Sequence, residues 1–284
     1  MVAAGRTGHR ESGSDDSGAR RGPFPGRRQR RLGQNFLADS NLLDAIVEDA
    51  EIQDDDVVLE VGGGNGVLTE KLASRCRFVH LVELDRSLAD RLEPIADQLG
   101  NVGIIWEDAL KVDLSALQPP PTRMVANLPY SIATPLLIET VVGIPSIQHW
   151  VVMVQREIAQ RLTARAGSRK YGSPSVIVGI GCDAREVRKV NPAVFVPRPR
   201  VESSLIRIDR IGPPPDADLH LLVRDAFAHR RKSLARSLET TGPGRGETAR
   251  RALSELGLPI DSRAEALTPE EFVALRAKME ELDD

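Results

Sequence analysis

The chain is poor in cysteine and in aromatic side chains. Cys76 and Cys182 stand far apart among 284 residues and form no C-x-x-C pair, so the sequence encodes neither a disulfide framework nor a zinc site. No run of about 18 uninterrupted apolar residues is present, which argues against a membrane span. The N-terminus carries charge without an apolar segment, which argues against a secretory signal. We therefore expect a cytoplasmic protein that binds no metal and no membrane.

Basic residues are concentrated in particular stretches, although the net charge is only −3. Residues 41–60 contain eight acids and no base. Bases outnumber acids in residues 156–170, 185–210 and 224–236. If these stretches share a face, that face attracts a phosphate backbone. Composition alone gives equal weight to the alternative, a set of solvated helix surfaces.

Residues 1–31 are rich in Gly, Ser and Arg and have few apolar side chains to bury. This composition predicts a disordered tail. A solvated tail is favoured over a basic arm that contacts RNA.

Short apolar strands alternate with amphipathic helices along most of the chain. We predict strands at residues 57–61, 78–82, 102–106, 123–126 and 149–154, and helices at residues 41–50, 67–74, 88–99 and 132–142. Residues 173–181 suit either a buried helix or a strand. Residues 187–190 and 204–208 are typical of late strands that close a sheet edge. The pattern predicts an α/β fold with a doubly wound, mostly parallel sheet covered on both faces.

A rigid break at Gly212-Pro213-Pro214-Pro215 marks the predicted domain boundary. Three helical patterns follow it, at residues 219–238, 248–256 and 269–282. We therefore expect a larger domain over residues 32–211 and a small C-terminal α-helical domain over residues 212–284.

A glycine-rich turn joins the first of these strands to its helix, in the sequence Val-Leu-Glu-Val-Gly-Gly-Gly-Asn-Gly at residues 58–66. Glycine allows tight backbone geometry and the close approach of a ligand. Gly62, Gly64 and Gly66 form G-x-G-x-G, whereas the dinucleotide fingerprint needs glycine where Val67 stands. The turn therefore suits a carboxypropyl and ribose group better than a pyrophosphate. A plain tight turn is the alternative.

Two acids follow the next two predicted strands. Glu83 lies about 20 residues beyond Gly62, where an acid accepts hydrogen bonds from ribose hydroxyls. Asp108 can accept from an adenine amino group, with Trp106 or its neighbours beside the ring. Either acid alone is more often a surface carboxylate, but ligands bind at the carboxyl ends of parallel strands.

Asn127-Leu128-Pro129-Tyr130 ends the fourth predicted strand. Pro129 fixes its own φ and favours extended geometry at Leu128, so that carbonyls can point into a cleft. An exocyclic base amine is a poor nucleophile because its lone pair is delocalised into the ring. The Asn127 side-chain oxygen and the Leu128 carbonyl can accept its N–H bonds and orient the lone pair, while Tyr130 stacks on the base. A proline turn beside a core tyrosine is the alternative.

A second rigid loop, Phe195 to Ser203, carries an aromatic residue beside Arg198 and Arg200. We expect Phe195 to cover the opposite face of an extruded base while the arginines contact phosphate. The alternative is a hydrophobic plug.

Together these motifs resemble the ribosomal RNA adenine N6-dimethyltransferase family of the small subunit. The resemblance runs in order from about Leu32 to Ile208 and weakens beyond it. The residues that carry it are Gly33-Gln34-Asn35-Phe36-Leu37, the glycine turn, Glu83, Asp108-Ala109-Leu110, Asn127 to Tyr130, Gln155-Arg156-Glu157, Tyr171-Gly172 and Phe195 to Ser203. A further segment, residues 227–234, resembles the family's basic helix.

The resemblance implies a class I methyltransferase fold that uses S-adenosylmethionine. It implies dimethylation at N6 of two adjacent adenosines in the 3′-terminal hairpin loop of 16S rRNA, with a role in small-subunit biogenesis. The implied partner is the small ribosomal subunit precursor, and we expect a monomer. By family position, the cofactor-binding residues are Asn35, Leu37, Gly62, Glu83, Asp108 and Asn127.

The sequence departs from the family pattern in three places. Gly63 replaces the usual proline between two glycines, Arg236 stands where the basic helix commonly has asparagine, and the tail of residues 1–31 is additional. The first departure puts the rigidity of the cofactor turn in doubt, and the second puts one RNA contact in doubt.

Three other functions are the alternatives. A 23S rRNA adenine N6-methyltransferase of the macrolide-resistance type shares several motifs. A ribosome-assembly factor that binds RNA without catalysis would leave the Asn127 to Tyr130 loop without a role. A nicotinamide-dependent oxidoreductase is excluded by Val67.

Overall fold

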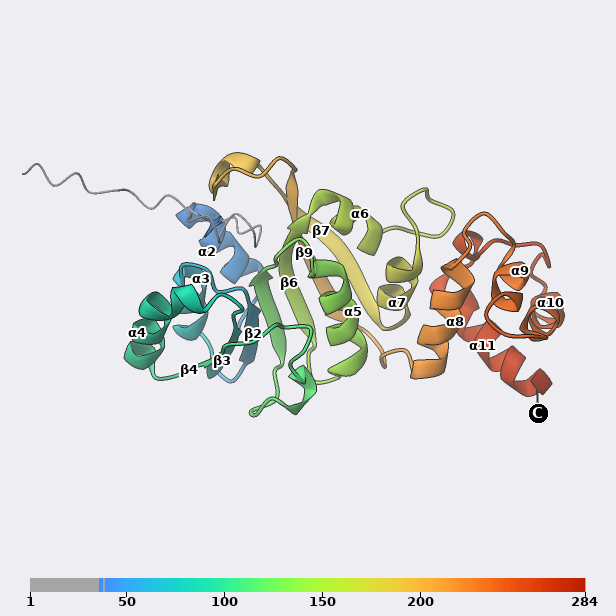
Figure 1. The fold of residues 1–284 in the computed structure, drawn as a ribbon, viewed down its shortest axis with the longest axis horizontal. Coiled ribbons are helices and arrows are strands. Elements are labelled where there is room, and N and C mark those ends of the chain that lie inside the picture. Colours follow the sequence, from blue (N-terminus) through green and yellow to red (C-terminus); the bar gives the residue numbers. More distant parts are fainter. Residues whose placement is uncertain (1–35, 38, 284) are drawn as a thin grey trace, which may run out of the picture.

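The computed structural model describes residues 36–37 and 39–283 of the chain. A seven-stranded sheet in the order β4-β3-β2-β5-β6-β9-β7 forms its centre (Figure 1). The strands are β2 (Val57–Val61), β3 (Phe78–Val82), β4 (Val102–Ile105), β5 (Arg123–Asn127), β6 (His149–Gln155), β7 (Cys182–Val190) and β9 (Ser203–Arg210). Pairing from β4 through to β6 is parallel, and β9 runs antiparallel to both of its neighbours. The predicted parallel sheet and its late closing strands are confirmed.

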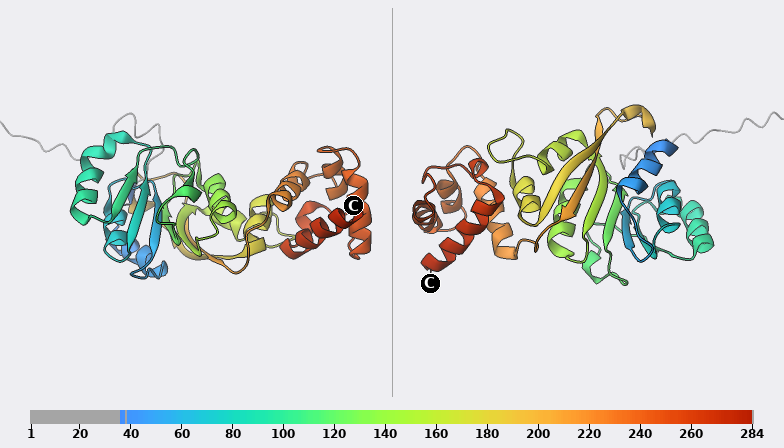
Figure 2. Two further views of the ribbon diagram at one scale, coloured as in Figure 1. Left: turned by 90° about the horizontal axis from the view of Figure 1, so that it is seen from below. Right: turned by 180° about the vertical axis from the view of Figure 1, so that it is seen from behind.

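Helices cover both faces of the sheet, as the continuously apolar strands predict (Figure 2). The helices before residue 212 are α2 (Ser40–Asp49), α3 (Val67–Ala73), α4 (Ala89–Leu99), α5 (Ala133–Gly143), α6 (Arg156–Leu162) and α7 (Ser173–Gly181). Alternate residues of β6 face opposite cores. Val151 and Met153 pack with α2 and α3, whereas Trp150 and Val152 pack with α5 and α6.

A two-stranded ribbon lies outside the main sheet and was not predicted. It pairs β1 (Phe36–Leu37) with β8 (Phe195–Val196) in antiparallel register. The segment between β7 and β9 therefore reaches back to the start of the described chain, arching beside α2 (Figure 1).

The C-terminal region is helical, as predicted. It comprises α8 (Ala217–Phe227), α9 (Leu234–Glu239), α10 (Arg245–Glu255) and α11 (Pro269–Asp283). Their apolar faces share one cluster with Tyr171 and Ile177. Helix α7 thus contributes to the core of the C-terminal helices as well as to that of the sheet.

The prediction of one helix over residues 219–238 is wrong, because the chain turns between Phe227 and Leu234. The Ser237 hydroxyl donates to the Asp225 carbonyl at 2.7 Å and accepts from the His229 amide at 3.3 Å. The Leu234 amide donates to the Ser262 carbonyl at 2.8 Å. Tertiary partners therefore replace helical hydrogen bonds here, and the basic residues 229–232 lie in the turn rather than in a helix.

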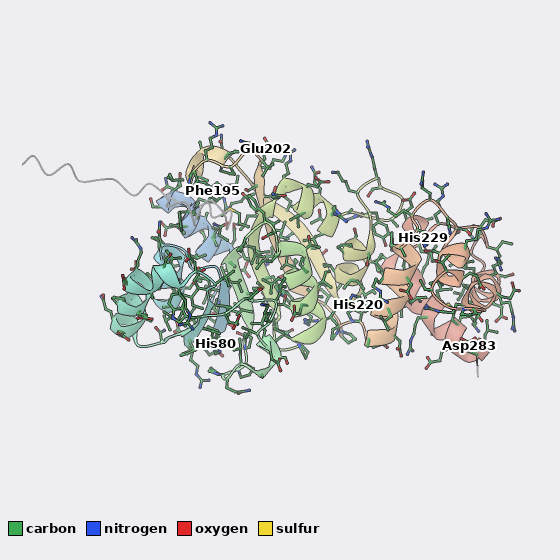
Figure 3. All side chains as sticks on the ribbon, viewed as in Figure 1. His80, Phe195, Glu202, His220, His229 and Asp283 are labelled. Carbon is green, nitrogen blue, oxygen red and sulfur yellow. The ribbon has the colours of Figure 1, made fainter. Side chains whose placement is uncertain are left out.

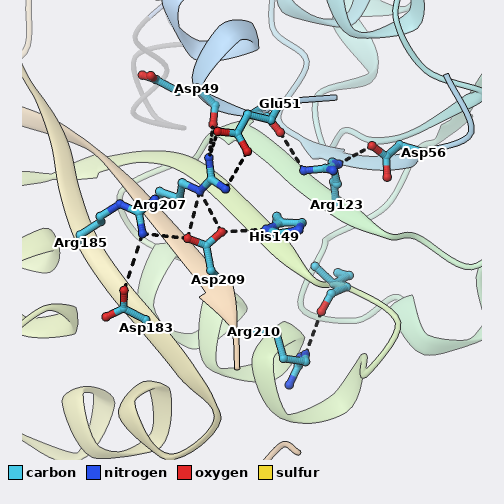
Figure 4. A network of polar contacts seen from close by, with 12 residues as sticks. Asp49, Glu51, Asp56, Arg123, His149, Asp183, Arg185, Arg207, Asp209 and Arg210 are labelled. Atoms are coloured by element: carbon cyan, nitrogen blue, oxygen red, sulfur yellow. Dashed lines mark hydrogen bonds and ion pairs between the residues drawn. The ribbon is translucent and has the colours of Figure 1, made fainter. Parts of the chain in front are cut away.

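Ion pairs at one end of the sheet bind its antiparallel strands to the end of α2 and to β6 (Figure 4). Arg207 of β9 pairs with Asp209 at 2.8 Å and with Glu51 at 2.7 Å, and its side chain is only 13% exposed. His149 Nδ1 lies 2.7 Å from Asp209 Oδ1. Burial raises the pKa of Asp209, but hydrogen bonds from His149 and Arg207 outweigh it and hold the pKa below its ordinary value.

This network changes how the charge pattern is interpreted. Acids of residues 41–60 neutralise two bases of the stretch 185–210, since Glu51 pairs with Arg207 and Asp49 with Arg188. Part of the predicted basic surface is therefore engaged in ion pairs within the protein.

In the described part of the chain, no helix is long and apolar enough to cross a membrane.

Replacing Arg207 tests the network. We expect Arg207→Ala to lower the free energy of unfolding by about 2–4 kcal/mol, because Asp209 loses its main partner in a nearly buried setting. Arg250→Ala removes an exposed ion pair and should cost about 0.5 kcal/mol or less. Urea unfolding of both variants checks this, and equal costs would show that the network contributes no special stability.

Candidate functional site

A cleft opens at the carboxyl ends of β2, β3 and β5. Its walls combine the glycine turn after β2, Glu83 after β3 and the loop after β5. Of the predicted site residues, the structure brings together Leu37, Gly62, Gly64, Glu83, Asn127, Leu128, Pro129 and Tyr130. Gly66, Asp108 and Phe195 do not line the cleft, and Asn35 lies outside the described residues.

The glycine turn touches the loop after β5. Gly62 has φ +82°, and its amide donates to the Val82 carbonyl at 2.9 Å. A Cβ on Gly62 would stand 3.4 Å from Pro129 Cδ, so the two segments are already in contact. Gly66 has a different role, because a Cβ there would lie 2.6 Å from Ile95 of α4. It packs α3 against α4 rather than facing the cleft.

Gly63 is the residue that departs from the family pattern. The space beside it, where a side chain would lie, is occupied by Leu81 of β3. A Cβ at this position would lie 2.7 Å from Leu81 Cδ1. The buried Leu81 side chain thus occupies the space that a side chain on residue 63 would need. The neighbouring donor is retained, since the Gly64 amide donates to Glu83 Oε2 at 3.3 Å.

Glu83 is held in place by the backbone around it. Besides Gly64, the Asp85 amide donates to its carboxylate, to Oε1 at 2.9 Å. The side chain is 5% exposed, and burial raises its pKa although these amides oppose the shift. A fixed acceptor at the cleft wall, with lone pairs left over, suits hydroxyl donors.

Asp108 stands beyond the cleft described above. Its Oδ1 accepts from the Leu110 amide at 3.1 Å, which closes the turn after β4. Two apolar side chains lie exposed next to the predicted acids, Leu84 at 54% and Leu110 at 37%.

The loop after β5 is anchored at two points. The Leu128 amide donates to the Met153 carbonyl of β6 at 3.1 Å, and Leu128 is buried. Tyr130 Oη lies 2.7 Å from Ser203 Oγ of β9, and burial raises the pKa of Tyr130. The tyrosine ring is therefore fixed from the antiparallel edge of the sheet.

Phe195, which was expected to cover the opposite face of an extruded base, is buried, as the alternative of a hydrophobic plug predicts. The ring is 2% exposed and packs in the cluster that contains Leu43, Val190 and Leu205. The ribbon pairing of β8 with β1 turns Phe195 inward, while its neighbour Val196 is 51% exposed. In this position Phe195 supports the wall beneath the cleft.

Several cleft residues were missed by the sequence analysis. They are Phe36, Leu43, Glu60, Asn65, Val67 and Leu68. Glu60 had a visible signal, as an acid inside an otherwise apolar strand. It is fully buried, which raises its pKa to about 8, and the negative charge of Glu83 adds to the shift.

Residues 36–37 and 39–283 contain no group of three or more His, Cys, Asp or Glu placed to hold a metal ion.

Comparison with known proteins gives consistent results. A family model described as ribosomal RNA adenine dimethylase matches residues 26–280. A Rubrobacter xylanophilus protein named ribosomal RNA small subunit methyltransferase A is 43% identical, over 88% of this chain and 94% of its own. A protein of the same name from Alkaliphilus metalliredigens is 37% identical, over 86% and 89%.

Two solved structures are similar over most of the chain. A dimethyladenosine transferase from Plasmodium falciparum has a TM-score of 0.73 and 24% identity, covering 87% of this chain and 98% of its own. The 23S rRNA methyltransferase ErmE has a TM-score of 0.65 and 26% identity, covering 87% and 100%. The first likeness establishes the fold, a class I methyltransferase sheet with a helical C-terminal region.

The buried Glu60 carboxyl predicts a pH dependence of stability. Its ordinary pKa is 4.5, so between about pH 5 and 8 the folded protein retains a proton that the unfolded chain releases. The stability of the cofactor-free protein should therefore fall as pH rises through this range. In Glu60→Gln we expect the fall to be smaller by about 1–3 kcal/mol.

Unfolding at a series of pH values measures this effect. The exposed Glu93, replaced by Gln, is the matched control and should leave the wild-type dependence unchanged. Identical pH profiles for Glu60→Gln and the wild type would mean that Glu60 is ionised at neutral pH.

Proposed function

The chain belongs to the ribosomal RNA adenine dimethylase family, and on that premise we propose how it acts and on which nucleotides. It transfers methyl groups from S-adenosylmethionine to N6 of two adjacent adenosines in the 3′-terminal hairpin loop of 16S rRNA, giving N6,N6-dimethyladenosine. The main support for this proposal is that Asn127 to Tyr130 line the same cleft as the glycine turn and Glu83.

The glycine turn and Glu83 suit the cofactor. Gly62 and Gly64 have positive φ, and a side chain on Gly64 would crowd Phe36. Glu83 would accept hydrogen bonds from the two ribose hydroxyls, and Leu37 would close the cleft from the β1 side. Asn35 and Asn127 are also assigned to the cofactor site, by their position in the family's motifs. When bound, the cofactor supplies an electrophilic methyl group on a sulfonium.

The adenine of the cofactor would lie beyond Glu83, toward Asp108. The exposed side chains of Leu84 and Leu110 offer apolar contact to a flat ring. Asp108 already binds the Leu110 amide through Oδ1 and retains acceptor capacity for an adenine amino group. No metal is assigned a role.

The loop after β5 would hold the substrate amine. The Asn127 side-chain oxygen and the Leu128 carbonyl accept its two N–H bonds, which aims the nitrogen lone pair at the methyl carbon. Transfer of the methyl group would break the C–S bond of the sulfonium and leave a neutral thioether. The amine would then release a proton to solvent, so no strong base would be required beforehand. The Tyr130 ring, fixed by Ser203, stacks on the target base. Stacking is assigned to Tyr130 alone, since Phe195 is buried.

We assign residues 32–211 as the catalytic domain, residues 212–284 as an rRNA-binding domain and residues 1–31 as a separate tail. Arg231 and Lys232 are exposed in the turn between α8 and α9, where they can meet phosphate. Arg230 is held by the Tyr171 carbonyl at 2.8 Å and by Glu265. Arg236 is exposed on α9. The proposed partner is the small-subunit precursor in the cytoplasm, bound by a monomer.

The alternative 23S rRNA target is less well supported. Two relatives that are named for the small subunit are 43% and 37% identical over most of the chain. A role in assembly without catalysis would leave the Asn127 to Tyr130 loop in the cleft without a task.

Glu83→Ala should weaken binding of S-adenosylmethionine by about 1.5–3 kcal/mol, the cost of a charge-assisted hydrogen bond. Titration calorimetry measures it. Glu93→Ala removes an equal charge from the exposed face of α4 and should leave the affinity unchanged. Unaltered affinity in Glu83→Ala would rule out the ribose role.

The target is tested in a strain that lacks the gene. The wild-type chain should restore the primer-extension stop in 16S rRNA and none in 23S rRNA. We expect Asn127→Ala and Tyr130→Ala to abolish the stop, while the Tyr130→Ala protein still binds cofactor. Tyr130→Phe, which keeps the ring, should retain most of the activity. A restored stop in 23S rRNA, or full activity of both alanine variants, would refute the proposal.

A further inference from the structure

A second cleft is lined in part by Ser203, the residue that anchors Tyr130. The side chains that matter in it are Arg156, Lys189, Asn191, Arg198, Glu202 and Ser203. Ser203 is a wall of this cleft, and its hydroxyl holds Tyr130, which lines the first cleft. Figure 3 labels Glu202 and Phe195 along this edge of the molecule, close to the arching segment between β7 and β9. The second cleft therefore adjoins the proposed position of the target base.

The second cleft is basic and its charge is not neutralised. Lys189 and Arg198 are exposed and form no ion pair with any described residue. Two other bases of strands β7 and β9 are paired with acids, Arg188 with Asp49 and Arg207 with Glu51. Unpaired cations gathered in a concave surface create a field that favours an anion.

Arg156 lies at the base of this cleft and is held by one acid. Its Nη1 pairs with Glu202 Oε2, and its amide donates to the Glu202 carbonyl at 3.0 Å. Its Nε is buried and has no hydrogen-bond partner among the described residues. The Glu202 side chain is 60% exposed, so the carboxylate can move away without breaking the core.

We propose that this cleft binds the RNA phosphate next to the target adenosine, with Glu202 as a counter-anion that the phosphate displaces from Arg156. The proposal rests on the proposed function, because the Tyr130 ring defines which base is adjacent. Lys189 and Arg198 meet the phosphate oxygens, and Asn191 can donate a further hydrogen bond. Binding the phosphate on one side of Ser203 places the attached base on the other, against Tyr130.

Charge removal in the full-length protein tests the site. For Lys189→Ala and Arg198→Ala we expect KM for unmethylated small subunits to rise about tenfold with kcat little changed, as for loss of a positioning contact. The dependence of log KM on log salt should become shallower by about 0.7–0.9 for each variant. Arg75→Ala, an equal loss of charge at the opposite end of the sheet, should change neither quantity.

Direct binding separates this proposal from the proposed function. With a hairpin oligonucleotide of the 3′-terminal 16S sequence, Lys189→Ala and Arg198→Ala should bind about tenfold more weakly than Arg75→Ala. Glu202→Gln should bind about threefold more tightly, because it removes the competing acid. A wild-type protein that binds this RNA but methylates no rRNA would defeat the proposed function only.

Three results would overturn the phosphate site. The first is RNA binding by Lys189→Ala and Arg198→Ala equal to that of Arg75→Ala. The second is unchanged RNA binding in these variants together with weakened binding of inorganic phosphate, which would assign the cleft to a small anion. The third is unchanged or weaker RNA binding by Glu202→Gln, which would refute the displacement of Glu202.

Discussion

The close approach of Gly62 to Pro129 sets the geometry on which the proposed reaction depends. One residue belongs to the turn that would hold the methyl donor, and the other to the loop that would hold the acceptor. A Cβ on Gly62 would stand at van der Waals distance from the proline ring. Because β2 and β5 are parallel neighbours, the segments that follow them begin at the same end of the sheet. The fold thereby places the segment that would bind the methyl donor beside the segment that would bind the acceptor, before either ligand is present.

The antiparallel edge of the sheet supplies the rest of the site. Strand β9 carries Ser203, which fixes Tyr130, and farther along the strand Arg207, which joins the ion-pair network. The same strand thus links the stability of the sheet to the orientation of the proposed stacking ring. Beyond Ser203, the unpaired bases Lys189 and Arg198 extend the site toward the RNA backbone.

Local sequence signals were sufficient where one segment determines its own structure. The apolar strands, the glycine turn and the Asn127 to Tyr130 loop follow from residue type and spacing, and the cleft contains most of the predicted residues. Asp108 was placed by its position after a strand, but its carboxylate is engaged in closing its own turn. Its place in the cofactor site remains a prediction.

Other features depend on distant partners and could not be predicted. The break between α8 and α9 depends on Ser237 and Ser262, and the burial of Phe195 depends on a ribbon with β1. The space beside Gly63 is filled by Leu81, which lies in the next strand. In each case a tertiary contact outweighs a plausible local interpretation.

The most direct test of the account is a crystal structure of the protein with S-adenosylmethionine bound. The account predicts the methionine part beside Gly62 and Gly64, the ribose hydroxyls on Glu83, and the methyl carbon facing the Asn127 side chain and the Leu128 carbonyl. A methyl group screened from residues 127–130, or a cofactor bound away from Glu83, would contradict it.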